Sequence, residues 1–234
     1  MTTTINGAPG TDLAGWTWRV DPPDGWLVVP ATGLDTPDSI TLWERESTAA
    51  VRESIEPRPA DPGDLQASAS PADPVELDDE ARTALDRMAA EAVANLRAFA
   101  DGMAPDGHRV AARLGVLGRG PVPVLVAVGV SDPAEPDDGL LAALGATGGY
   151  PIAPPTVEYP EVPDGDGVRV VRLDIGEETG GAWMSVGLGR RTEHPDAVVD
   201  TVLVWRTQDL LLGAAMVEWL DELLAAVLIT RSAA

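Results

Sequence analysis

The sequence predicts an α+β fold in which two long helices pack on an antiparallel sheet of about six to eight strands, like an α/β/α sandwich. Three observations predict it. Short apolar runs that alternate at period two recur between turn residues, as in antiparallel strands. Two longer stretches carry apolar residues at helical spacing. Hydrophobic residues make up 44% of the 234 residues, which is typical of a globular chain.

The N-terminal part of the chain predicts three strands. Residues 16–20, Trp-Thr-Trp-Arg-Val, alternate at period two. The short apolar run at residues 26–29 follows the turn signal Pro-Pro-Asp-Gly and predicts the next strand. Residues 40–45, Ile-Thr-Leu-Trp-Glu-Arg, alternate again, so we expect a third strand there.

Two segments lack the pattern of packed elements. Residues 1–13 are rich in Thr, Gly and Pro and predict a flexible tail. Residues 53–75 contain five prolines among Ala, Ser and Asp, which predicts a surface loop. We therefore expect residues 14–234 to form a single α+β domain that carries this proline-rich loop.

Two long helices are predicted, one before and one after the main run of strands. The first has Asp73 as an acidic N-cap, followed by proline, and its apolar stripe stops at Gly102. The second starts after a cap at Thr207 or Asp209 and is expected to run to about Thr230. Its polar stripe is narrow, so this helix either packs deeply on the sheet or is shared with another subunit.

Between the two helices the sequence predicts a hairpin and a three-stranded meander. The second hairpin strand is apolar on both faces and should be central in the sheet. A short helical piece at residues 140–144 separates hairpin and meander. The predicted strands are residues 109–117 and 122–130 for the hairpin, and 168–175, 183–189 and 198–207 for the meander.

The chain is strongly acidic. It has 38 acidic residues against 16 basic ones, all arginine, with a formal net charge of −22 and no cysteine. This charge repels nucleic acid and anionic lipid, so we expect neither as a partner, and it favours a basic protein. Without cysteine there are no disulfides and no zinc–thiolate sites. The abundance of Ala, Gly, Pro, Asp and Val indicates a GC-rich, bacterial genome.

No targeting or membrane-spanning segment is predicted. The first ten residues lack the basic and apolar regions of a signal peptide. The long apolar stretch at 210–229 contains Glu218, Asp221 and Glu222, each of which costs about 2.5–3.5 kcal/mol on insertion. We therefore expect a soluble, cytoplasmic protein.

No catalytic, cofactor or metal site is predicted. His108 and His194 each have a carboxylate nearby, but no nucleophile lies at a defined spacing, so an exposed loop histidine is the favoured interpretation. Ser185 lacks the glycine two residues earlier that a nucleophile elbow needs. The glycine-rich segment 115–120 lacks the context of a phosphate-binding loop. The acidic loop 131–139 lacks EF-hand spacing and predicts a solvated loop.

Several apolar side chains are candidates for a protein interface. Trp16 and Trp18 share one strand face near the tail, and tryptophan is enriched at binding hot spots. Trp219, Leu220 and Leu223 lie on the mostly apolar last helix, through which a homo-oligomer could form. The alternative for these tryptophans is a core role, since the chain has seven Trp and only one Phe.

A further candidate is the acidic stretch from Glu158 to Glu178. It carries seven acidic residues against two arginines. Such a stretch could face a basic partner, although a solvated face is the commoner arrangement.

The order of elements resembles the Mog1/PsbP-like group, which includes DcrB-like and LpqN-like proteins. Pro-Pro-Asp-Gly-Trp at residues 22–26 leads into a strand, and Val-Leu-Val-Trp-Arg-Thr at 202–207 leads directly into the last helix. The resemblance implies an α/β/α sandwich with an adaptor or accessory role and no shared catalytic residues. The proline-rich stretch at 53–75 and the missing lipoprotein signal depart from it.

Three functions follow as expectations. The first is a non-catalytic protein-binding protein, an adaptor or chaperone-like accessory factor, with a bacterial secretion system as one setting. The second is an acidic immunity or inhibitor protein that neutralises a basic toxin, because a charge of −22 would steer such an association. The third is an enzyme whose site is assembled from scattered Asp, Glu, Arg and His residues.

Overall fold

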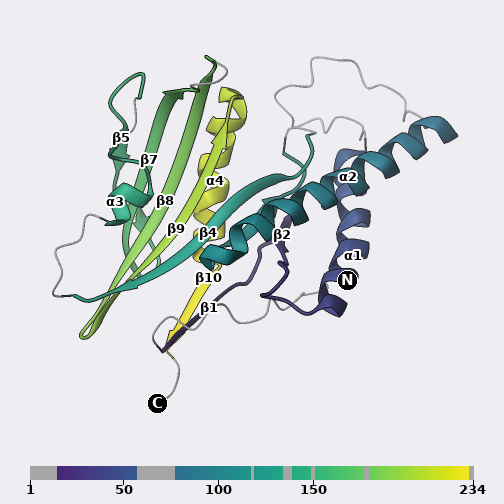
Figure 1. The fold of residues 1–234 in the computed structure, drawn as a ribbon. Helices are drawn as coiled ribbons and strands as arrows, with labels where there is room; N and C mark the ends of the chain where they lie inside the picture. Colours follow the sequence, from purple (N-terminus) through teal and green to yellow (C-terminus); the bar gives the residue numbers. More distant parts are fainter. Residues whose placement is uncertain are drawn as a thin grey trace.

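The fold is α+β, with one large antiparallel sheet, a small two-stranded sheet and helices on both faces of the large one (Figure 1). The computed structural model describes residues 15–56, 77–116, 119–133, 139–148, 151–176 and 180–231. The predicted tail at 1–13 lies outside these ranges, as do residues 57–75 of the predicted loop.

The large sheet has eight strands in the order β2-β3-β4-β9-β8-β7-β5, with β6 also paired to β7. All its pairings are antiparallel. Its strands are β2 (Trp26–Val29), β3 (Arg109–Arg113), β4 (Val122–Ser131), β5 (Thr156–Glu158), β6 (Glu161–Val162), β7 (Gly165–Ile175), β8 (Ala182–His194) and β9 (Ala197–Thr207). The small sheet pairs β1 (Trp16–Val20) with β10 (Val227–Arg231). The predicted hairpin, the central place of β4 and the predicted meander are therefore confirmed.

The helices divide between the two faces of the large sheet. They are α1 (Pro37–Ile55), α2 (Asp79–Met103), the short 3-10 turn η1 (Ala104–Asp106), α3 (Gly139–Ala143) and α4 (Leu210–Ala225). Successive residues of a strand point to opposite faces of the sheet, so the neighbours of the β3 side chains show which helices cover each face. Ala111 packs in the core with α4, whereas Val110 and Ala112 pack with α1 and α2. Helix α3 lies on the same face as α1 and α2, but over β7, β8 and β9.

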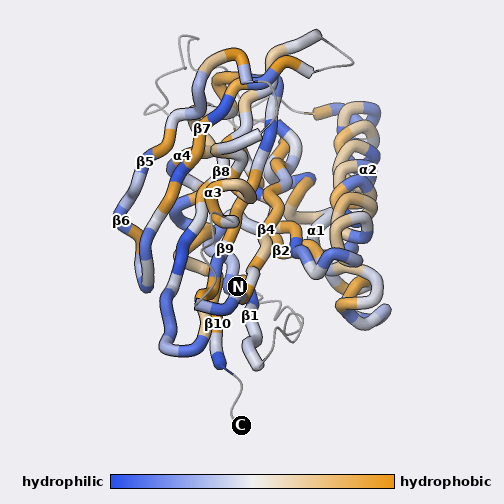
Figure 2. The backbone as a smooth tube through the Cα atoms, turned by 60° about the vertical axis from the view of Figure 1, so that its left-hand side comes forward, coloured by the Kyte–Doolittle hydropathy of each residue, from blue (hydrophilic) through white to orange (hydrophobic). Residues whose placement is uncertain are grey.

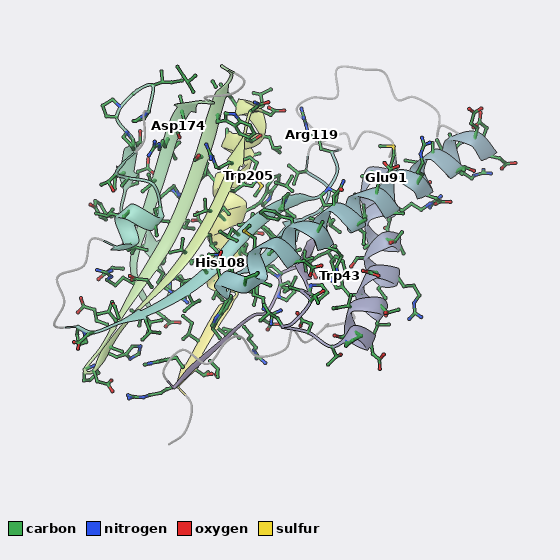
Figure 3. The ribbon with its side chains drawn as sticks, in the orientation of Figure 1. Trp43, Glu91, His108, Arg119, Asp174 and Trp205 are labelled. Atoms are coloured by element: carbon green, nitrogen blue, oxygen red, sulfur yellow. The ribbon has the colours of Figure 1, made fainter. Side chains whose placement is uncertain are left out.

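Residues 40–45 form part of helix α1, so the predicted third strand is wrong. Thr36 caps the helix by accepting a hydrogen bond from the Ser39 amide, and proline follows the cap. The buried residues Trp43, Ser47 and Val51 recur every four positions and face α2 and the sheet (Figure 3). The period-two alternation of residues 40–45 covers only six residues. The helical spacing of the buried side chains becomes visible only over the 19 residues of the whole helix.

The two predicted long helices are only partly confirmed. Helix α2 ends at Met103 as expected from Gly102, but its N-cap is Asp78, whose carboxylate accepts from the Ala81 amide. Asp73 lies outside the described residues. The last helix begins after the Asp209 cap but ends at Ala225 rather than near Thr230. The following residues, Val-Leu-Ile-Thr-Arg, form β10, and the predicted helix is wrong there.

A buried ion pair and a buried hydrogen bond link the α1–α2 layer to the sheet. Arg109 of β3 donates to the Asp35 carboxylate at 2.5 Å, and both side chains are 6% exposed. Asp35 also accepts from the Ala31 amide. On α2, the buried Arg97 donates to the Pro30 carbonyl and to Asp101.

Hydropathy alternates along α2, as expected for a helix with one packed face (Figure 2). None of the helices described is long and apolar enough to cross a membrane.

Candidate functional site

A groove of about 780 Å³ lies between α3 and the β6–β7 hairpin, on the α3 face of the sheet. Its walls combine apolar, aromatic and charged side chains. The lining residues are Leu140, Leu141, Tyr159, Pro160, Glu161, Val162, Gly165, Asp166, Gly167, Val168 and Arg191. Figure 1 places α3 beside β7 at this edge of the sheet.

One wall exists because two glycines of β8 let α3 approach the sheet. A Cβ atom added at Gly189 would lie 2.7 Å from Leu140 Cδ1, and one added at Gly187 would lie 3.0 Å from the Leu144 carbonyl oxygen. Both distances are shorter than an ordinary contact, so a side chain at either position would force its neighbours near α3 to shift. Leu140 and Leu144 are thereby buried, and α3 is fixed above β7 and β8.

The opposite wall is a tight hairpin. Pro163 and Asp164 connect β6 to β7, and Asp164 has a positive φ of 61°, the pattern of a type II turn. Further along β7, a Cβ atom at Gly167 would collide with the Pro160 carbonyl oxygen and with Val162. Glycine at this position lets residues Pro160–Val162 lie close beside β7.

A row of charged residues crosses the sheet at the groove. Glu161 of β6 pairs in register with Asp166 of β7, Asp166 with Arg191 of β8, and Arg191 with Asp200 of β9. Directly opposite residues share one face of a sheet, so all four side chains lie on the α3 face. Three of the four are acidic.

The one guanidinium in this row is bound to Asp200. Arg191 Nε donates to Asp200 Oδ1 at 2.8 Å and Arg191 Nη2 to Asp200 Oδ2 at 2.6 Å, a bidentate pair. Glu161 and Asp166 are exposed, and neither carboxylate has an ion-pair partner among the described residues. The groove therefore has two carboxylates that face each other across a strand pair and form no ion pair with a described residue, although Asp166 lies opposite Arg191.

The other arginines near the groove also have partners. Arg169 donates to Glu158 and to Asp221. Arg190 points to the α4 face and donates to the carbonyls of Pro163 and Val227. Burial lowers the pKa of Arg190, and the nearby Asp164 opposes that shift. Neither side chain lines the groove.

The remaining surface of the groove is suited to contact with an organic partner. Tyr159 is 75% exposed at the rim. Leu140 and Val168 are buried, and Leu141 is half-buried beside them. An apolar wall beside an exposed aromatic ring and two carboxylates combines contact area with polar groups that can orient a ligand.

The titratable groups of the described lining are Glu161, Asp166, Tyr159 and Arg191. It contains no histidine, serine, threonine or lysine. His108 and His194 lie elsewhere, and both are half-buried rather than exposed as predicted. His194, at the end of β8, lies with its ring 4.5 Å from the Trp16 ring, whereas His108 follows η1 near the end of α2. Ser185 is a strand residue of β8, as predicted.

Metal ligation has no candidate group in the part of the chain that the structure describes, where no three His, Asp or Glu side chains converge. The predicted acidic loop at 131–139 lies mostly outside that part, since residues 134–138 are not described.

The predicted interface residues have a different place from the groove. Trp16, Trp18, Leu220 and Leu223 are buried, between 0% and 6% exposed, so their side chains pack within this chain. Leu220 and Leu223 lie on the side of α4 that packs on the sheet. Trp219 is half-buried, with the Arg113 guanidinium 5.3 Å from its ring centroid. The core role is confirmed for Trp16 and Trp18, and for most of the chain's tryptophans.

Sequence reasoning found part of this site and missed the rest. The acidic stretch Glu158–Glu178 contains both carboxylates of the groove, but nothing in it shows that they face each other. Tyr159 and the α3 leucines were not predicted to belong to a site. One signal was available: glycines alternating at 187 and 189 in a predicted strand mark a close approach of other chain.

No model of a known protein family, no curated protein and no solved structure matches this chain. The resemblance to the Mog1/PsbP-like group therefore stays a prediction.

Proposed function

We propose that this chain is a non-catalytic protein-binding protein, an adaptor or chaperone-like accessory factor, and that the groove between α3 and the β6–β7 hairpin contacts its partner. The observation that carries the proposal is the groove's chemistry: an exposed Tyr159 and two carboxylates, which form no ion pair with a described residue, beside apolar walls. These groups provide contact area and orientation, which binding requires.

The groove also fits the role of a docking site by its construction. Glycines at 187 and 189 seat α3, and Gly167 allows the Pro160–Val162 segment to lie close to β7. Both walls are thus fixed by the large sheet, so the groove is pre-organised, and little ordering is needed when a partner binds. An exposed aromatic side chain on a rigid support is typical of interface hot spots.

Site-specific photocrosslinking in cells that naturally express the chain tests the proposal. A photoreactive amino acid replaces Tyr159 in one variant and Glu91 in a matched control. Glu91 is exposed on α2, on the side of the molecule away from β7 (Figure 3). We expect one stoichiometric adduct from position 159 and none from position 91. The captured protein, once purified, should bind the unmodified chain. No adduct at 159, or the same adducts at both positions, would refute the proposal.

A second candidate function is favoured by the net charge of −22: an acidic inhibitor or immunity protein bound to a basic protein. The two differ in what binding does to the partner. An inhibitor abolishes the partner's activity at equimolar concentration, whereas an adaptor or chaperone leaves it intact or increases the soluble amount. Assay of the captured partner with and without the chain decides between them.

A further inference from the structure

We propose that the groove takes a positively charged side chain, an arginine, from an extended segment of the partner protein, between Glu161 and Asp166 and against the Tyr159 ring. This inference rests on the proposed function and specifies the chemistry of its partner. It follows from three features of the groove.

The first feature is the like-charge pair. Glu161 and Asp166 are directly opposite in the β6–β7 pairing, where side chains lie about 4.5–5.5 Å apart at Cβ. Like charges at this position destabilise a strand pair. A cationic group between them would turn the repulsion into two charge-assisted hydrogen bonds. The short β6 strand thus holds an arrangement that is unfavourable in the free protein and favourable around a cation.

The second feature is the lack of an internal cation bound to this pair among the described residues. Arg191, the next residue in the row, holds Asp200 through both carboxylate oxygens. Arg169 holds Glu158 and Asp221, and Arg190 lies on the other face of the sheet. Arg191 lies opposite Asp166 but donates to Asp200, and no described arginine forms a hydrogen bond or ion pair with Glu161 or Asp166. A cation that binds both carboxylates directly would therefore come from outside the described chain.

The third feature selects arginine over a small cation. Tyr159 stands exposed at the rim, and a guanidinium stacks on an aromatic ring while it donates in its plane to carboxylates. The apolar wall formed by Leu140, Leu141 and Val168 would contact the aliphatic stem of the arginine and an apolar neighbour. A bare divalent ion would use neither the ring nor this wall, and it prefers six or more oxygen ligands.

Fluorescence polarisation with short labelled peptides tests the inference. One peptide places arginine between leucine and valine, and its partner peptide replaces arginine by the neutral isostere citrulline. The protein variants are Glu161→Gln, Asp166→Asn and Tyr159→Ala, with Glu91→Gln as the control for charge removal elsewhere. Circular dichroism melts establish that each variant folds. Removing a carboxylate in the groove relieves repulsion or is neutral to folding, so loss of binding would not reflect unfolding.

We expect the arginine peptide to bind, and the citrulline peptide to bind weaker by on the order of tenfold or more. Glu161→Gln and Asp166→Asn should each weaken the arginine peptide by a similar factor, Tyr159→Ala should weaken it, and Glu91→Gln should not. Affinity should fall as salt is raised.

Equal binding of the two peptides, or full affinity in Asp166→Asn, would overturn the inference. So would a rise in melting temperature with calcium chloride alone that Asp166→Asn abolishes, because the groove would then be a metal site. The proposed function fails separately: if photocrosslinking at position 159 captures a partner while the arginine peptide does not bind, the docking role stands and the arginine assignment falls.

Discussion

The seat of α3 on the sheet gives a sharp test of how the groove is built. Gly189→Ala places a methyl group 2.7 Å from Leu140 Cδ1, 3.0 Å from Leu144 Cδ1 and 3.2 Å from the Thr201 carbonyl oxygen. The carbonyl belongs to the neighbouring strand β9 and cannot move aside, so the two leucine side chains and the helix that carries Leu140 have to give way. The substitution should therefore push α3 off the sheet by a few tenths of an ångström or more.

The magnitude follows from two opposing terms. Overpacking a well-packed site costs about 1–3 kcal/mol. Replacing glycine by alanine inside a strand gains roughly 0.5–1 kcal/mol, because the unfolded chain loses freedom. The net expectation for Gly189→Ala is a loss of about 0.5–2 kcal/mol in the free energy of unfolding. Gly129→Ala in β4 is the matched control, since a Cβ atom there meets nothing within 4 Å and the backbone is extended.

Gly129→Ala should only gain stability from the reduced freedom of its unfolded chain, without any overpacking. The free energies of unfolding of the two variants should therefore differ by about 1–3 kcal/mol, the cost of overpacking at Gly189. For a chain of this size that corresponds to roughly 2–12 °C in melting temperature. Urea denaturation measures the difference, and hydrogen exchange of the amides in residues 139–144 localises it. Equal stabilities for the two variants, or unchanged exchange in α3, would show that the glycines do not set the approach of this helix.

Three further predictions concern charged groups. Glu161→Gln should raise the free energy of unfolding by about 0.2–1 kcal/mol in urea denaturation, because it removes the repulsion from the carboxylate opposite it; a loss would contradict this. Asp35→Ala should cost about 3–5 kcal/mol, since it removes the carboxylate from a buried ion pair with Arg109; a cost under about 1 kcal/mol, as for exposed pairs, would refute it. The hydrogen bond from Arg231 holds the pKa of Asp196 below its usual value, so this contact stabilises the fold above the ordinary pKa of aspartate and is lost as pH falls through the lowered one. Arg231→Gln should raise the Asp196 pKa in an NMR titration, and an unchanged value would show that the contact is not formed.

Much of the fold could be predicted because its signals are local. Apolar and polar residues alternate along β7, β8 and β9, and turn residues separate these strands. This pattern was enough to predict both the three strands and their antiparallel pairing. The errors came where a local pattern was short. Six residues of α1 alternate by chance, although the stripe through Trp43, Ser47 and Val51 is helical. Residues 227–231 continue the apolar run of α4, and only their pairing with β1 makes them a strand.

The candidate site depends on the register of neighbouring strands, and β6 was not among the strands predicted from the sequence. The acidic stretch Glu158–Glu178 was recognisable in the sequence. Only the strand register shows that Glu161 lies opposite Asp166 and that Arg191 lies opposite Asp200, to which it donates hydrogen bonds. The apolar wall likewise depends on α3, which lies more than 15 residues from β6 in the chain and reaches the groove through the two β8 glycines. Trp16 and Trp18 were predicted as interface residues because the chain is unusually rich in tryptophan. In the structure both side chains are buried in the core.

The like-charge pair in the groove links stability to function. A protein with 38 acidic residues could have placed a neutral side chain opposite Asp166, and the strand pair would then have been more stable. Elsewhere the same sheet does pair its charges: Arg172 holds Asp174 within β7, and Arg191 holds Asp200 across to β9. The repulsion between Glu161 and Asp166 remains in the groove, whereas charges elsewhere in the sheet are paired. This pattern is expected where a protein has lost some stability in exchange for binding a partner. A stabilised Glu161→Gln variant that no longer binds its partner would show that trade directly.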